Sequence, residues 1–120
     1  MQATGGTLDF EVLRRAIEGR DAETLAGLYA DDAEVLTINR NSTPSTPAVL
    51  RGKEEIGEYL RDVCSREMTH RVENEVVAED RIAFQEACEY PDGVRVLGAE
   101  TLEVRDGKIV RQVNIEAWDE

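Results

Sequence analysis

The amino-acid sequence predicts an α+β fold in which helices come first and an antiparallel sheet follows. In the first part of the chain apolar residues recur at helical spacing, whereas in the last part apolar and polar residues alternate with the period of a strand. Near the end, Asp106-Gly107 stands between two alternating runs. This pair favours a tight hairpin turn, because glycine accepts the positive φ that the turn requires. Helices followed by consecutive strands are typical of the α+β class.

Composition narrows the classes of function. A chain of 120 residues is long enough for one domain with a real core. Hydrophobic residues make up 41% and charged residues 33%, as expected of a soluble globular protein. No apolar run reaches membrane-spanning length and no basic-then-apolar leader is seen, so we expect a cytoplasmic protein without a membrane partner. The net charge of −12 argues against nucleic acid, because phosphate binding needs clustered lysine and arginine.

The N-terminal half is predicted to be mainly helical. Residues 1–6 carry no pattern and are expected to form a flexible tail, with the domain spanning 7–120. Thr7 can cap a first helix that ends near Gly19, and Asp21 can cap a second, shorter helix that closes at 30–32, before a short strand over 33–38. The apolar faces of these two helices would comprise Phe10, Leu13, Ala16 and Ile17 in the first, and Leu25, Leu28 and Tyr29 in the second.

An irregular segment, a third helix and four strands complete the chain. Residues 39–49 are polar and contain two prolines, which predicts a loop. The third helix begins at Gly52, and its predicted apolar face comprises Ile56, Tyr59, Leu60 and Val63. The strands are expected over 69–78, 80–90, 94–104 and 109–118. Their predicted inward faces comprise His70, Val72, Asn74 and Val76; Ile82, Phe84, Glu86, Cys88 and Tyr90; Val96, Gly98, Glu100, Leu102 and Val104; and Gln112, Asn114, Glu116 and Trp118.

Several short motifs resemble the SnoaL-like branch of the NTF2-like superfamily. They are Gly-Arg-Asp at 19–21, Leu-Tyr-Ala-Asp-Asp-Ala-Glu-Val at 28–35, Arg-Gly-Lys-Glu-Glu-Ile at 51–56 and Val-Arg-Asp-Gly-Lys-Ile-Val at 104–110. The resemblance implies a cone-shaped α+β barrel, in which a curved sheet wraps the first helix and leaves one pocket. It also implies a homodimer paired through the outer face of the sheet. The apolar residues predicted on that face are Val77, Ala83, Ala87, Val113, Ile115 and Ala117.

The known activities of the superfamily carry over poorly, residue by residue. The general-base aspartate of ketosteroid isomerases falls at Thr37, their tyrosine falls near Leu13, and only their oxyanion-stabilising acid has a counterpart, Glu100. The carboxylate–arginine–carboxylate pattern of limonene epoxide hydrolase falls on Glu116, Glu86 and Cys88. The resemblance therefore predicts a fold and a pocket but assigns no reaction.

Three glutamates are predicted on the apolar side of the sheet. Glu86, Glu100 and Glu116 would point into the pocket, where burial and mutual repulsion raise carboxyl pKa values and favour general acid/base catalysis without a cofactor. His70 is a fourth candidate catalytic residue, although its place beside Val72 on the apolar face favours a hydrogen-bonded histidine of the pocket wall over a catalytic base. The ligand-binding candidates are Asn114, Trp118, Phe84, Thr37 and Cys88.

Alternatives remain open at this point. The last strand could have the opposite phase, with Val113 and Ile115 inward. Three glutamates and a histidine could hold a divalent metal, but nothing in their spacing requires one, and no metal is predicted. The predicted function is a pocket for a small, largely apolar molecule, with possible isomerase, cyclase, dehydratase or hydrolase chemistry. The alternatives are a non-catalytic binding module and an accessory dimerisation domain of the same fold.

Overall fold

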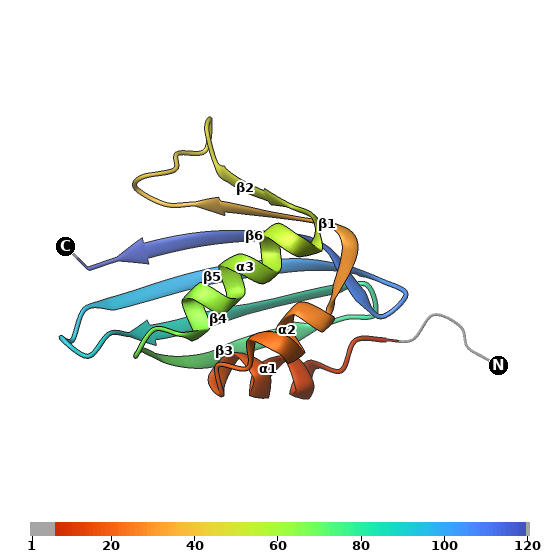
Figure 1. Ribbon diagram of the computed structural model, residues 1–120, viewed down its shortest axis with the longest axis horizontal. Coiled ribbons are helices and arrows are strands. Elements are labelled where there is room, and N and C mark those ends of the chain that lie inside the picture. The colour runs from red at the N-terminus through yellow and green to blue at the C-terminus, as the bar shows by residue number, and fades with distance from the viewer. Residues whose placement is uncertain (1–6, 120) are drawn as a thin grey trace.

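The computed structural model describes residues 7–119, so the predicted tail over 1–6 and residue 120 lie outside the described residues. Helices α1 (Phe10–Glu18), α2 (Ala22–Gly27) and α3 (Gly52–Cys64) lie on one face of a six-stranded sheet (Figure 1). The strands are β1 (Tyr29–Ile38), β2 (Ala48–Arg51), β3 (Thr69–Val77), β4 (Arg81–Glu89), β5 (Arg95–Arg105) and β6 (Lys108–Trp118). Their order is β2-β1-β6-β5-β4-β3, and β1–β6 is the one parallel pair. The predicted α+β fold with a curved sheet is confirmed.

The N-terminal helices follow the prediction except at their ends. Asp9, not Thr7, is the N-cap of α1: its carboxylate accepts a hydrogen bond from the Glu11 N–H at 2.9 Å. Asp21 caps α2, as predicted, by accepting from the Thr24 N–H at 3.1 Å. The prediction that Tyr29 and residues 30–32 end this helix is wrong. They already belong to β1, which pairs with β6 from Tyr29 onward.

A β-bulge changes the phase of β3. Asn74 has a φ of 55°, and the register with β4 gains one residue between Glu73 and Val76. His70 and Val72, before the bulge, are buried as predicted. Val76, after it, was predicted inward but lies opposite Ala83 on the outer face and is 68% exposed. Val76 therefore lies on the outer face, where the sequence predicted Val77. Val77 itself pairs with Ile82, which points inward.

A second bulge decides the phase of the last strand. Asp106 and Gly107 form the predicted turn with φ values of 53° and 75°. Beyond it Ile109 pairs with Val104, but Arg111 pairs with Glu103, so Val110 has no partner across the ladder. Ile109 and Gln112 consequently both point inward, with exposures of 0% and 6%. The phase with Gln112 and Asn114 inward is confirmed.

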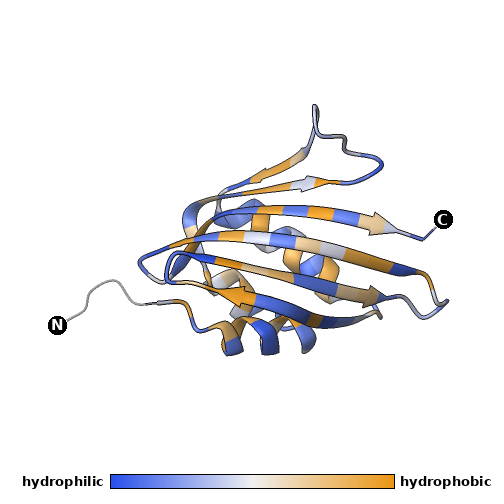
Figure 2. Cartoon of the chain, turned by 180° about the vertical axis from the view of Figure 1, so that it is seen from behind, coloured by the Kyte–Doolittle hydropathy of each residue, from blue (hydrophilic) through white to orange (hydrophobic). Residues whose placement is uncertain are grey.

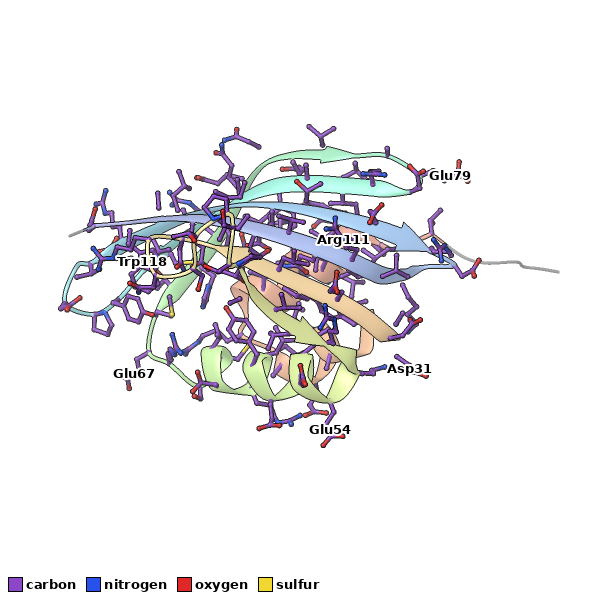
Figure 3. All side chains as sticks on the ribbon, turned by 90° about the horizontal axis from the view of Figure 1, so that it is seen from above. Asp31, Glu54, Glu67, Glu79, Arg111 and Trp118 are labelled. Atoms are coloured by element: carbon purple, nitrogen blue, oxygen red, sulfur yellow. The ribbon has the colours of Figure 1, made fainter. Side chains whose placement is uncertain are left out.

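The core lies between the helices and the concave face of the sheet. Leu13 of α1, Ile56 of α3, and Leu102 and Ile109 of the sheet are all almost completely buried. Hydropathy alternates along the strands in the view from behind (Figure 2). Seen from above, Asp31, Glu54 and Glu67 extend outward from the periphery (Figure 3). Leu13, Ile56 and Leu102 also line a pocket, which therefore adjoins the core.

Candidate functional site

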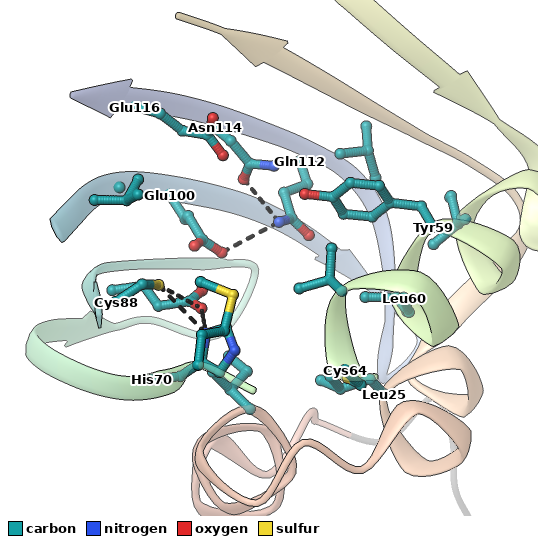
Figure 4. A pocket seen from close by; sticks show the side chains of 18 of the residues that line it. Leu25, Tyr59, Leu60, Cys64, His70, Cys88, Glu100, Gln112, Asn114 and Glu116 are labelled. Atoms are coloured by element: carbon teal, nitrogen blue, oxygen red, sulfur yellow. Dashed lines mark hydrogen bonds and ion pairs between the residues drawn. The ribbon is translucent and has the colours of Figure 1, made fainter. Parts of the chain in front are cut away.

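A pocket of about 130 Å³ lies between α3 and the concave face of the sheet. Its helical side is apolar, with Leu13, Ile17, Leu25, Ile56 and Leu60. Its sheet side is polar and carries the three predicted glutamates. Glu100 and Glu116 are labelled in Figure 4, beside Gln112 and Asn114. The pocket thus has one apolar wall and one wall rich in hydrogen-bonding groups, an arrangement typical of ligand sites.

The strand register brings the three glutamates together. Glu86, Gly98 and Glu116 are direct neighbours across β4, β5 and β6. Gly98 has no side chain, and a Cβ built there would lie 3.6 Å from Glu100 Oε2. The carboxyl group of Glu100, two residues along β5, therefore lies over the glycine, beside the glutamates of both neighbouring strands.

Glu86 is the ionised member of a hydrogen-bonded pair with Glu100. Burial alone would raise the pKa of Glu86, but hydrogen bonds from Glu100 and His70 outweigh it and lower this pKa below the usual range. His70 Nδ1 lies 2.7 Å from Glu86 Oε2, and both side chains are largely buried. The Cys88 Sγ lies 3.4 Å from the same oxygen. Burial and the charge of Glu86 raise the pKa of the Cys88 thiol, which excludes a reactive thiolate near neutral pH.

Glu100 is the protonated member of the pair. Burial, followed by the charge of Glu86 beside it, raises the pKa of Glu100 well above the usual range. The protonated carboxyl donates a hydrogen bond to Glu86, and its Oε1 accepts one from Gln112 Nε2 at 3.2 Å. The pair therefore holds one proton and one negative charge inside a largely apolar pocket.

Gln112 connects Glu100 to the rest of the polar wall. Its Oε1 accepts from the hydroxyl of buried Tyr29 at 2.5 Å, and its Nε2 donates to Asn114 Oδ1 at 2.8 Å. Asn114 in turn donates to Thr37 Oγ1 at 3.3 Å. Gln112 thereby joins Glu100 to Asn114 in the pocket wall (Figure 4).

Glu116 links the pocket to the loop between β1 and β2. Its Oε1 accepts from Asn39 Nδ2 at 3.0 Å and from Trp118 Nε1 at 3.3 Å. The other amide atom of Asn39, Oδ1, accepts the backbone N–H groups of Asn41 and Ser42, both at 2.9 Å. One side chain thus ties the first turn of the loop to a glutamate of the pocket.

A metal would have to compete with an existing hydrogen bond. Candidate ligand atoms of His70, Glu86 and Cys88 lie within 4.8 Å of one another. However, Nδ1 of His70 already faces Glu86, and Nε2 is buried without a partner. Metal-bound histidines usually donate their second N–H to a carboxylate or carbonyl, which this Nε2 lacks. The geometry therefore fits a hydrogen-bonded His–Glu pair better than a metal centre.

The sequence profile of the SnoaL-like domain matches residues 10–112, which is most of the chain. The chain belongs to the SnoaL-like family. The match ends at Gln112, so the last part of the polar wall of this SnoaL-like domain, Asn114, Glu116 and Trp118, lies beyond it. None of the curated proteins compared with the chain matches it significantly.

Solved structures support the same fold. An NTF2-like protein of unknown function from Mesorhizobium loti has a TM-score of 0.75 and 22% identity, with 90% of this chain and 89% of that chain covered. A Kribbella flavida protein named as a proposed ketosteroid isomerase has a TM-score of 0.73 and 21% identity, covering 92% and 75%. A SnoaL-like protein of unknown function from Burkholderia thailandensis has a TM-score of 0.65 and 18% identity, covering 92% of each chain. At these identities the likeness establishes the fold alone.

In this SnoaL-like domain the pocket includes eight of the nine residues singled out from sequence. They are Glu86, Glu100, Glu116, His70, Asn114, Trp118, Phe84 and Cys88. Thr37 is not among the lining residues and reaches the site only through its hydrogen bond with Asn114. Sequence reasoning missed Asn39, which it placed in an unpatterned loop, and Tyr29, which it assigned to a helix. An Asn directly after a strand is a turn signal that could have identified the first.

The part of the chain that the structure describes contains no helix that is both long enough and apolar enough to cross a membrane.

Proposed function

We propose that this protein binds a small, largely apolar molecule in the pocket and transfers protons to and from it without a cofactor. The observation that carries the proposal is that Glu86 and Glu100 meet in the pocket wall, where burial and the charge of Glu86 raise the pKa of Glu100 well above its usual range. A carboxyl group kept protonated by burial and by a neighbouring carboxylate is a general acid that remains loaded near neutral pH. Isomerisation, dehydration and aldol-type cyclisation each need little more than such a group.

The proposed proton cycle uses the pair as one unit. Glu100 gives its proton to an oxygen or carbon atom of the ligand, and the pair is then doubly ionised. Repulsion between the two carboxylates drives recovery of a proton from another position of the ligand, which returns the pair to its starting state. His70 holds Glu86 in place, and Gln112 holds Glu100, so both carboxyls keep their orientation through the cycle.

The size of the pocket limits the ligand. An engineered apolar cavity of roughly 150 Å³ holds a benzene molecule. The pocket here has a volume of about 130 Å³, so it suits one six-membered ring with short substituents rather than a fused polycyclic skeleton. The apolar wall from α1 and α3 would contact the ring, and the glutamates would contact its polar atom.

Deuterium exchange next to the carbonyl group of cyclohexanone, followed by NMR in D2O, tests proton transfer directly. We expect exchange above the buffer rate, with Glu100→Gln and Glu86→Gln slowing it by about 10²–10⁴-fold. The matched control is Glu103→Gln on the same strand, because Glu103 is half-buried on the outer face and pairs with Arg81. Equal rates in the wild type and Glu100→Gln would refute the proposal.

A second candidate function, binding without conversion, is supported by the hydrogen-bond network. Gln112, Asn114, Glu86 and Glu116 all have partners within the protein. A wall whose polar groups satisfy one another is also what a binding module needs, because it is rigid before the ligand arrives. A probe that binds but shows no exchange above buffer would favour this candidate.

The outer face of the sheet supports a homodimer as part of the proposal. Leu97, Ile115 and Val76 are 47%, 55% and 68% exposed, and Ala83, Ala87, Val113 and Ala117 lie among them. A second copy of the chain would cover these apolar residues and is the arrangement that the resemblance implies. The cytoplasm is the proposed location, since Cys64 and Cys88 are both unpaired and thiols persist best in a reducing compartment.

A further inference from the structure

The charges around the pocket are unbalanced. Three carboxyl groups, Glu86, Glu100 and Glu116, line it, and Arg66 is the only lysine or arginine among the described lining residues. The guanidinium of Arg66 is already engaged: it donates to Asp62 at 2.6 Å and to the Tyr90 hydroxyl at 3.1 Å. No other cationic side chain among those lining residues is available to the glutamates, apart from His70, which contacts Glu86 alone among them.

Aromatic rings surround the same space. Phe84 lies on the sheet next to Glu100, Tyr59 comes from α3, and Tyr90 and Trp118 lie at one end of the pocket with ring centroids 6.0 Å apart. Aromatic faces attract cations through their quadrupole, and carboxylates attract them through charge. A pocket that combines aromatic rings with carboxylates, and in which no lysine competes for them, favours a positively charged ligand.

We infer that the ligand of this pocket is a small organic ammonium ion with an apolar body, held between the three glutamates and the aromatic rings. The inference rests on the pocket of the proposed function and names the class of molecule that it accepts. With an ammonium ion bound, the doubly ionised pair would begin the same proton cycle by taking a proton from the ligand, and would then return it at another position. In the balanced step, the ammonium enters with its charge, Glu100 loses its proton to solvent, and the complex keeps two carboxylates beside one cation.

Binding exchanges one cation for another, because a proton leaves the pocket as the ammonium ion enters. Without a ligand, the second carboxyl of the pair is neutral because a second buried charge would lack compensation. An ammonium group supplies that compensation and up to three N–H donors, which Glu86, Glu100 and Glu116 can accept. Binding of a cation can therefore compensate ionisation of the second carboxyl group of the pair. A neutral ligand cannot compensate this charge, and an anion is repelled by it.

Every element around Glu100 agrees with this direction of proton flow. The titratable groups that face it are acids or neutral groups, apart from the single histidine: Glu86 and Cys88 of β4, Glu116 of β6, Tyr29 of β1, Tyr59 of α3, and His70 of β3 behind Glu86. Affinity for an ammonium ion should rise with pH until Glu100 is ionised in the free protein, and proton release should then vanish.

Three ring compounds of one size separate the possibilities: benzylamine, benzyl alcohol and benzoate. Calorimetric titration of the full-length protein near neutral pH, in two buffers of different ionisation enthalpy, measures affinity and released protons together. We expect benzylamine to bind at least about tenfold more tightly than benzyl alcohol, because charge-assisted hydrogen bonds are the stronger ones, with close to one proton released. Benzoate should not bind.

Two variants make the outcome specific. Glu100→Gln, which keeps the shape of the side chain, should abolish proton release and weaken benzylamine by about tenfold or more, whereas Glu103→Gln should change neither. Circular dichroism of both variants checks that they fold. The inference is overturned if benzyl alcohol binds as tightly as benzylamine, if no proton is released, or if none of the compounds binds. The cyclohexanone exchange is independent: exchange without ammonium selectivity would leave the proposed function standing and remove only this inference.

Discussion

Replacing Gln112 by methionine should destabilise the protein far more than its small change in volume suggests. Methionine fills a similar space but cannot serve the Tyr29 hydroxyl or Asn114 Oδ1, both of which are buried. Each buried polar group left without a partner costs about 1–3 kcal/mol, so two of them cost about 2–6 kcal/mol. A domain of this kind has a total stability of about 5–15 kcal/mol, so the loss would be a large part of it.

Urea unfolding monitored by circular dichroism measures this loss, and a double-mutant cycle assigns it. Tyr29→Phe removes the hydroxyl that Gln112→Met would leave unpaired. In the Tyr29→Phe background, Gln112→Met should therefore cost about 1–2 kcal/mol less than in the wild type. The matched control is Gln85→Met, on the outer face of β4, which should stay within about 0.5 kcal/mol of wild type. Additive effects of Tyr29→Phe and Gln112→Met would refute the hydrogen-bond network as the cause.

Three further predictions follow from the site and its surroundings. Because the pKa of Glu100 is raised in the folded protein, this residue contributes to stability in full below its unfolded pKa, and the contribution is lost as the pH rises through the folded pKa. Glu100→Gln should not show this loss. Urea unfolding at several pH values measures it, and parallel curves of stability against pH for the two proteins would contradict the prediction. Asn39→Ala removes the hydrogen bonds that tie the loop to Glu116, so it should speed hydrogen exchange over 40–47, and ligand should slow exchange there in the wild type. Exchange rates that neither change affects would show that the loop is not coupled to the pocket. Light scattering at micromolar concentration should give the mass of a dimer, and Ile115→Glu, on the outer face, should give a monomer; a monomeric wild type would contradict the proposed interface.

Much of the fold could be predicted because local signals and global packing agree along most of the chain. The Asp106-Gly107 turn and the apolar face of α3 are both decided by a few neighbouring residues. The errors arose where that locality fails. Tyr29 looks like a continuation of α2 in sequence, but it is drawn into β1 by its pairing with Ile109, which lies 80 residues away. Such a contact leaves no local signal.

The site was predictable as a set of inward glutamates but not as a hydrogen-bonded arrangement. Alternation along a strand identifies which face Glu86 and Glu100 share, whereas their meeting over Gly98 depends on the register between strands. The bulge at Asn74 was missed for the same reason: asparagine adopts positive φ more readily than most residues, but the extra residue in β3 shows only in the register with β4. Inter-strand register, rather than residue type, is what the sequence withholds here.

The unpaired Val110 makes the chemistry of the pocket depend on one bulge. If Val110 instead paired with Glu103, with no change in the sequence, every later residue of β6 would move to the opposite face of the sheet. Val113 and Ile115 would then face the ligand, and the amides and Glu116 would face the dimer interface proposed above. Deleting Val110 would instead leave Gln112 opposite Leu102 and keep the polar wall, so the bulge and its deletion have the same effect on the pocket. Alignments of SnoaL-like domains that misplace such a gap would compare the walls of pockets with outer surfaces.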